Sequence, residues 1–69
     1  MTPTGDQIRT LREALGLTQS ELGAKIHLSN RDPSRYVRML EAGDRTPSPM
    51  LVAMLEGIAK AARVRVPWL

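Results

Sequence analysis

Four arginines cluster in the middle of the chain, where their side chains could bind a polyanion. They are Arg31, Arg35, Arg38 and Arg45. A guanidinium group donates two parallel hydrogen bonds, which match O6 and N7 of guanine as well as phosphate oxygens. The same segment supplies three further hydrogen-bonding side chains, Asn30, Ser34 and Tyr36. These residue types favour binding to duplex DNA; the alternative for each arginine is a solvated surface charge.

Catalytic and metal-binding chemistry has few candidates in this sequence. His27 is the only histidine, and there is no cysteine. The glutamates lie in separate segments, at Glu13, Glu21, Glu41 and Glu56. Metal sites need several converging ligands, so this scatter indicates exposed charges or ion pairs instead. We expect no catalytic residue, no metal and no cofactor.

The charge balance also favours a polyanionic partner. Ten basic and seven acidic residues among 69 give a net charge of +3. The excess comes from the central arginines and from Lys60, Arg63 and Arg65. We expect one domain, residues 1–69, that buries only ~60% of its unfolded surface. No apolar run is long enough to span a bilayer and no signal-peptide pattern is present, so a cytoplasmic location is expected.

Capping signals predict the elements that must position these side chains. Two helix starts have a capping box, in which a threonine is followed three residues later by glutamine or glutamate: Thr4 with Gln7, and Thr18 with Glu21. At the other two, an N-cap residue is followed by proline at the first helical position: Asp32 by Pro33, and Ser48 by Pro49. Gly16 suits the left-handed residue after the first helix. Beyond the last helix, residues 64–69 predict a short strand or an extended arm.

Apolar spacing predicts which sides of these helices are buried. The expected core is Ile8, Leu11, Leu15, Leu17, Leu22, Ile26, Leu28, Val37, Leu40, Leu51, Leu55 and Ile58, and Met54 is expected on the same stripe. Gly23, next to Leu22, is expected where a crossing helix comes close. Tyr36 should pack its ring at the edge of the core.

Residues 18–41 combine two of these helices into a helix-turn-helix motif, with a donor-rich second helix suited to a DNA groove. Residues 11–22, LREALGLTQSEL, resemble the first part of a Cro/cI-type (XRE-family) domain. Residues 37–48, VRMLEAGDRTPS, resemble the end of that family's recognition helix and the following loop. The resemblance covers about residues 8–58. It implies an all-α, compact, four- to five-helix lambda-repressor-like domain with a short C-terminal tail.

The resemblance assigns roles to particular residues. It implies that Arg12 pairs with Glu41 at the end of the recognition helix, and that Gln19 anchors a DNA phosphate. The alternatives are an uncoupled pair of surface charges and an exposed amide. Within the second helix, Arg35 is the first candidate for a base contact, with Ser34 beside it. Arg38 would contact a base or a phosphate, and Arg45 a phosphate or the minor groove.

The chain departs from the family pattern between the two motif helices. His27 stands where the family usually has glycine, and the turn is longer around Ser29 to Asp32. This turn is either a tolerated insertion or a segment that brings Asn30 and Arg31 against the DNA.

Function and assembly follow as expectations. The resemblance implies a sequence-specific transcriptional regulator, most simply a dimeric (auto)repressor on a palindromic operator, with repressors of phages or anti-CRISPR operons as one setting. The alternative is a protein-interaction module such as an antitoxin. An apolar tail predicts a homodimer through the C-terminal part of the last helix and the tail, within about residues 48–69. The expected interface residues are Val52, Val64, Val66, Trp68 and Leu69. The competing possibility is that Trp68 folds back over its own core.

Overall fold

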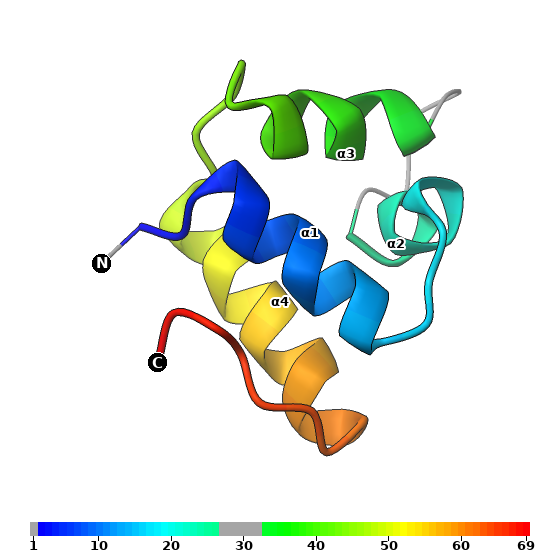
Figure 1. The fold of residues 1–69 in the computed structure, drawn as a ribbon, viewed down its shortest axis with the longest axis vertical. Coiled ribbons are helices and arrows are strands. Elements are labelled where there is room, and N and C mark those ends of the chain that lie inside the picture. Colours follow the sequence, from blue (N-terminus) through cyan, green and yellow to red (C-terminus); the bar gives the residue numbers. More distant parts are fainter. Residues whose placement is uncertain (1, 27–32) are drawn as a thin grey trace.

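Four helices make up the described part of the chain, residues 2–26 and 33–69, in the computed structural model. They are α1 (Gly5–Ala14), α2 (Gln19–Ile26), α3 (Pro33–Ala42) and α4 (Pro49–Ala61). Figure 1 shows α3 along one end of the molecule, α1 and α2 beneath it, and α4 leading to the opposite end. The all-α prediction is confirmed, and the described residues contain no strand. No described helix has an apolar stretch of membrane-spanning length.

The predicted helix starts are formed by the predicted side chains. The Thr4 Oγ1 atom accepts from the Gln7 N–H at 3.2 Å, and Gln7 Oε1 accepts from the Thr4 N–H at 2.8 Å. Thr18 and Glu21 form the same reciprocal pair, at 3.1 and 2.8 Å. Ser48 Oγ accepts from the Leu51 N–H at 3.2 Å. Each pair satisfies N–H groups that a helix start leaves without partners. Asp32 lies outside the described residues.

Three helices end in a residue with a left-handed backbone. Gly16 follows α1 with φ of 72°, and Gly43 follows α3 with φ of 84°. Arg63 follows α4 with φ of 58°. At each end, the next N–H bonds back to a carbonyl of the last helical turn, as in Leu17 N–H to Arg12 O at 3.2 Å. Glycine suits this position, whereas arginine there carries a steric cost.

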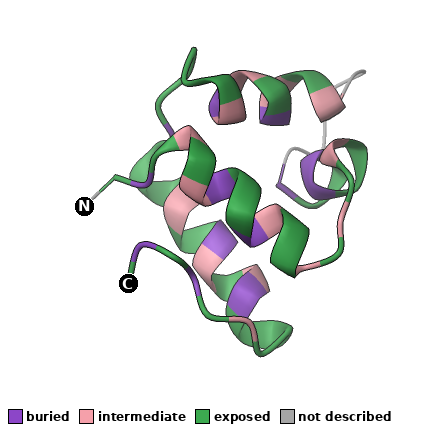
Figure 2. Cartoon of the chain, viewed as in Figure 1, coloured by how far each residue is buried: buried purple, intermediate pink, exposed green. Residues whose placement is uncertain are grey.

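The core lies where the four helices face one another (Figure 2). Its buried members are Ile8, Leu11, Leu22, Ile26, Val37, Leu40, Leu51, Leu55, Ala59, Val66 and Trp68. Leu15, Leu17, Tyr36 and Ile58 are partly buried against it, so Tyr36 packs at the core edge as predicted. Leu28 lies outside the described residues. The prediction for Met54 is wrong, since this side chain is 37% exposed.

The C-terminal tail completes the core instead of projecting from it. Val66 is 5% exposed and Trp68 is 7% exposed. The Trp68 Nε1–H group donates to Glu56 Oε2 on α4 at 2.9 Å. The expectation that Val66 and Trp68 form an exposed dimer patch is therefore wrong, because the ring buries on the core while its N–H keeps a partner. Among the large apolar side chains of the tail, only Leu69 is exposed, at 84%.

Two helical glycines allow the helices to approach α3 closely. A Cβ on Gly23 would lie 2.8 Å from Pro33 Cβ, as expected for a residue under a crossing helix. A Cβ on Gly5 would lie 2.7 Å from the Leu40 carbonyl oxygen, a contact that the sequence did not predict. Both distances are shorter than real Cβ contacts, so any larger residue would push α3 away.

Candidate nucleic-acid interface

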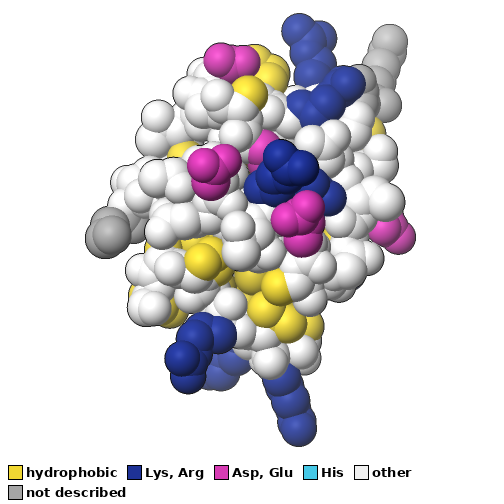
Figure 3. All heavy atoms as spheres, in the orientation of Figure 1, with side chains coloured by type: hydrophobic (Ala, Val, Ile, Leu, Met, Phe, Trp, Pro, Cys, Tyr) yellow, Lys and Arg dark blue, Asp and Glu magenta, His cyan; other side chains and the backbone are white. Residues whose placement is uncertain are grey.

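Helix α3 presents a basic face away from the core. Val37 and Leu40 are buried, while Arg35 and Arg38 are exposed. At 100° per residue, these two arginines lie on the side of α3 opposite the buried pair. Ser34 is partly buried at the flank of this face. Figure 3 shows Lys and Arg side chains standing out at the α3 end of the molecule. The structure therefore brings four of the predicted DNA-binding residues onto one helix. Arg35 and Arg38 are exposed, whereas Ser34 and Tyr36 are partly buried.

Arg45 joins this helix through an aromatic contact. Its guanidinium carbon is 5.8 Å from the centroid of the Tyr36 ring. The attraction between a cation and the face of an aromatic ring favours this placement. Tyr36 thus connects the core to the loop after α3, and its ring holds the Arg45 guanidinium beside the basic face. The sequence proposed Tyr36 and Arg45 as separate contacts and did not predict their pairing.

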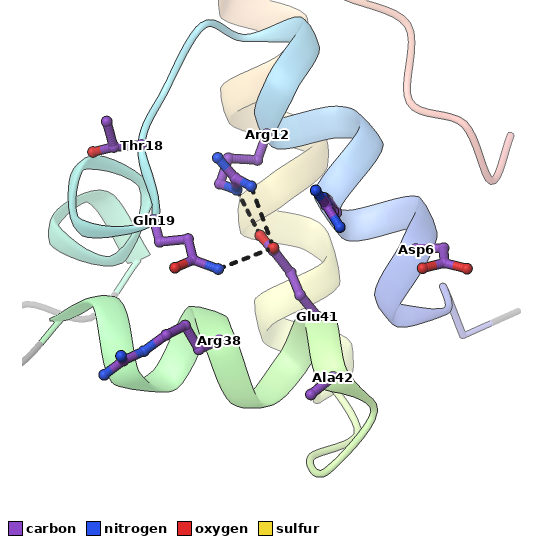
Figure 4. Close-up of a pocket in the computed structure, with 8 residues that line it drawn as sticks. Asp6, Arg12, Thr18, Gln19, Arg38, Glu41 and Ala42 are labelled. Carbon is purple, nitrogen blue, oxygen red and sulfur yellow. Dashed lines mark hydrogen bonds and ion pairs between the residues drawn. The ribbon is translucent and has the colours of Figure 1, made fainter.

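A nearly enclosed ion pair joins α1 to the end of α3, as the family resemblance implied (Figure 4). Arg12 Nε is 2.6 Å from Glu41 Oε2, and Arg12 Nη2 is 3.3 Å from Glu41 Oε1. The two side chains are only 13% and 7% exposed. The hydrogen bond to Glu41 raises the pKa of Arg12 above its ordinary value. A charged, two-pronged contact of this kind fixes both the distance and the angle between the helices.

Two neighbours extend this pair into a network. The Arg12 Nη1 group donates to the Leu17 carbonyl at 3.0 Å, in the link between α1 and α2. The Gln19 side-chain amide donates to Glu41 Oε1 at 3.2 Å. The carboxylate of Glu41 therefore accepts hydrogen bonds from both α1 and α2. Gln19 was predicted as a phosphate anchor, a role that stays a prediction; its internal contact with Glu41 was missed.

An open polar hollow of about 570 Å³ lies beside this network. Its lining is Asp6, Arg9, Arg12, Thr18, Gln19, Arg38, Glu41 and Ala42. Figure 4 shows that these residues come from α1, the start of α2 and α3. The first turn of a helix offers N–H groups and a positive dipole, so its position next to Arg38 suits an anionic group such as a phosphate.

The remaining predicted residues divide into three groups. Asn30 and Arg31 lie outside the described residues. Val52 and Val64 are partly buried against the core of their own chain. Leu69 alone of the predicted dimer residues is largely exposed, while Val66 and Trp68 are core residues. Among residues 2–26 and 33–69, no three His, Cys, Asp or Glu side chains are placed to hold a metal ion.

Comparison with known proteins identifies the family. A family model described as helix-turn-helix matches residues 8–69, which is nearly the whole chain. Neither the curated proteins nor the solved structures gave a match. The matching family consists of DNA-binding regulators and not of enzymes. It is the family that the two motifs resemble, and the matched residues contain α2, α3 and the Arg12–Glu41 pair. The chain thus belongs to the XRE-type, Cro/cI-like helix-turn-helix family of DNA-binding transcriptional regulators.

Proposed function

We propose that this protein is a sequence-specific repressor that inserts α3 into the major groove of its operator. The observation that carries this proposal is that α3 has exposed arginines on one side and buried apolar residues on the other. The end of α3 is held in place by the hydrogen bond from Arg12 to Glu41. An α-helix is about 10–12 Å across with its side chains and fits a groove about 12 Å wide. The 10 residues of α3 make it about 15 Å long. With no other domain required, occupancy of the operator would itself block polymerase, at the protein's own promoter in an autoregulator.

Each basic residue has a distinct role in this proposal. Arg35, near the start of α3, contacts guanine, with Ser34 beside it. Arg38 contacts a base or a phosphate, because it faces both the groove and the polar hollow. Arg45 contacts the backbone next to α3. Gln19 and the first turn of α2 contact a phosphate on the opposite side of α3 from Arg45.

Asn30 and Arg31 are proposed to add contacts from the turn that precedes α3. The full protein acts as a homodimer on an inverted repeat, with half-sites about 34 Å apart. We propose that the gene for this repressor belongs to a phage or to an anti-CRISPR operon.

Selection of bound fragments from random duplex DNA tests this function. A palindromic consensus is expected, and its affinity should fall steeply with salt because bound arginines release counterions from phosphates. The absence of any enriched sequence at low salt would overturn the proposal.

Single substitutions separate base contacts from phosphate contacts. Arg35→Ala should remove the preference for the consensus, at a cost of ~1–3 kcal/mol, whereas Arg45→Ala should weaken binding to all sequences about equally. Arg65→Ala in the tail removes the same charge away from α3 and is the matched control. If Arg35→Ala and Arg65→Ala behave alike, α3 does not recognise bases.

A protein-interaction function, such as that of an antitoxin, is the second candidate. It is favoured by the exposed apolar side chains of Met50 and Leu69, which are 76% and 84% exposed. In that case Arg35→Ala would leave the biological activity intact, and affinity for DNA would show no sequence preference.

A further inference from the structure

We propose that Met39 is a specificity-determining residue, whose apolar side chain contacts the C5-methyl group of a thymine in the operator. This inference rests on the proposed function, because it requires that α3 enters the major groove. It deepens that function by adding a thymine to the guanine assigned to Arg35. The methyl group of thymine is the one methyl group that the base edges present in the major groove.

Met39 is the large aliphatic side chain of α3 that the core does not use. Val37 and Leu40 are buried in the core, and Tyr36 is partly buried against it. Met39 is also partly buried, but the side chains that pack against the core in the described part of the chain do not include it. A helix position outside the core normally carries a polar residue. Packing within the monomer therefore does not explain this methionine.

Helix geometry places Met39 on the same side of α3 as the arginines. At 3.6 residues per turn, Met39 lies about 40° around the helix from Arg35 and about one turn further along. Arg38 lies about 60° from Arg35 in the other direction. Figure 1 shows α3 along one end of the molecule, with α1 and α2 beneath it. A groove that receives Arg35 therefore also receives the residues on its two sides, Met39 and Arg38.

The neighbouring charges decide which kind of apolar partner suits Met39. Any partner that covers this side chain must also accept Arg35 and Arg38, which are both exposed. An apolar protein surface would withdraw these charges from water at a cost in free energy. Duplex DNA offers both chemistries side by side, since phosphates and guanine edges accept from arginine while thymine carries a methyl group.

The turn after α3 fixes the backbone of Met39. Its carbonyl oxygen accepts from the Asp44 N–H at 2.9 Å and from the Arg45 N–H at 3.3 Å. Gly43, with φ of 84°, lets the chain reverse at this point. Met39 thus belongs to a rigid part of the helix, while its unbranched side chain can adapt to the shape of a base edge.

Ala42 is the second apolar residue on this side of α3, and its position suits the DNA backbone instead. It lies about two turns beyond Arg35, or about 10 Å along the helix. It lines the polar hollow together with Gln19, where the proposed function has a phosphate. Its side chain is a single methyl group. Met39, which is longer and nearer to Arg35, is the residue that can reach a base edge.

The spacing on α3 predicts where the thymine lies in each half-site. Arg35 and Met39 are four residues apart, which is about 6 Å along the helix. Base pairs are about 3.4 Å apart along duplex DNA. The thymine should therefore lie within about two base pairs of the guanine that Arg35 contacts.

Replacing single thymines of the selected half-site by deoxyuridine is the first test. Deoxyuridine lacks only the C5-methyl group and keeps the hydrogen-bonding edge of thymine. At one position the unchanged protein should bind roughly three- to fivefold more weakly, as expected when one methyl group is no longer buried. Fluorescence anisotropy on a duplex with one half-site, at a fixed salt concentration, measures the affinity. If no thymine position shows a loss, the proposal is overturned.

Met39→Ala is the second test, because it should remove this sensitivity to the methyl group. Alanine favours the helix and the methionine side chain is outside the core, so the variant should fold. It should bind the thymine and deoxyuridine duplexes equally, whereas Met39→Leu keeps an apolar side chain and should keep most of the difference. Met54→Ala is the matched control, since Met54 is a 37% exposed methionine on α4. Equal sensitivity to deoxyuridine in Met39→Ala and Met54→Ala would assign the methyl group to another residue and overturn the proposal.

Failure of this inference is distinguishable from failure of the proposed function. If selection gives a consensus whose guanine depends on Arg35, while deoxyuridine has no effect at any position, α3 reads bases without Met39 and only this inference is wrong. If no sequence is enriched, the repressor function fails and the thymine contact fails with it.

Discussion

The carboxylate of Glu41 is the single group on which the placement of α3 most depends. It accepts hydrogen bonds from Arg12 on α1 and from Gln19 on α2, and it is only 7% exposed. The Arg12 side chain is only 13% exposed, so losing the carboxylate would leave a positive charge with little compensation. The Arg12–Glu41 pair therefore matters through the cost of breaking it, more than through any net gain from forming it.

Glu41→Gln should lower the free energy of unfolding by about 3 kcal/mol, because it removes the negative partner and keeps the shape. Thermal unfolding followed by circular dichroism measures the change. Glu13→Gln is the matched control, since Glu13 forms an exposed pair with Arg9 at 3.6 Å. Its electrostatic effect on Arg12 is smaller than that of Glu41, so it should matter little. Equal melting temperatures for the two variants would show that the buried pair does not hold α3.

Arg63 offers a prediction with the opposite sign. Its φ of 58° is a conformation in which glycine is favoured over any residue with a Cβ. Arg63→Gly should therefore stabilise the protein by about 1 kcal/mol. Arg65→Gly removes the same side chain from a residue without positive φ, and it should be neutral or destabilising. Chemical unfolding of both variants measures the difference, and a loss of stability in Arg63→Gly would contradict the assignment.

At the scale of elements, the start of α2 should be sensitive to pH. The backbone hydrogen bond with Thr18 lowers the pKa of Glu21 below its ordinary value. A carboxyl group whose pKa is lower in the folded state contributes stability above its unfolded pKa, and this contribution disappears as pH falls through the folded pKa. The loss should therefore occur in acid, below about pH 5. Glu21→Gln should be less stable than the unchanged protein at neutral pH and equally stable in acid. A difference that does not change with pH would rule out this role.

Local rules explain which elements were predictable from the sequence. The capping pairs Thr4–Gln7 and Thr18–Glu21 act over three residues, so their spacing alone indicates the helix starts. Gly16 was predictable for the same reason. Contacts between distant segments carry no such signal: the sequence does not show that Gln19 turns toward Glu41, or that the Tyr36 ring meets Arg45. The Arg12–Glu41 pair spans 29 residues and was predicted only through the family resemblance.

The tail shows why burial was harder to predict than helix position. Alternating apolar and basic residues from Val64 onward fitted either an exposed arm or a strand. The structure uses Val66 and Trp68 to close the core of the monomer. The deciding contact is the bond from Trp68 to Glu56, and it depends on how α4 and the tail meet in three dimensions.

At the scale of the whole molecule, the two ends of α4 connect to different parts of the structure. Its beginning adjoins the loop that carries Arg45, and its end leads through Arg63 into the tail that covers the core (Figure 1). In a chain this short, the core contributes few kilocalories beyond the entropy lost on folding. The tail should therefore determine whether the domain folds at all, and its removal should affect every helix together.

Truncation after Val66 tests this dependence. Loss of a buried tryptophan typically costs about 3–5 kcal/mol, a large part of the stability of a small domain. We expect the truncated chain to be mostly unfolded at 37 °C, with helical circular dichroism and cooperative melting lost together. Deleting Leu69 alone removes an exposed side chain and should leave the melting curve nearly unchanged, which makes it the control. If the truncated chain kept a cooperative transition at the original temperature, Trp68 would be a passive cover and the core formed by α1 to α4 would be sufficient by itself.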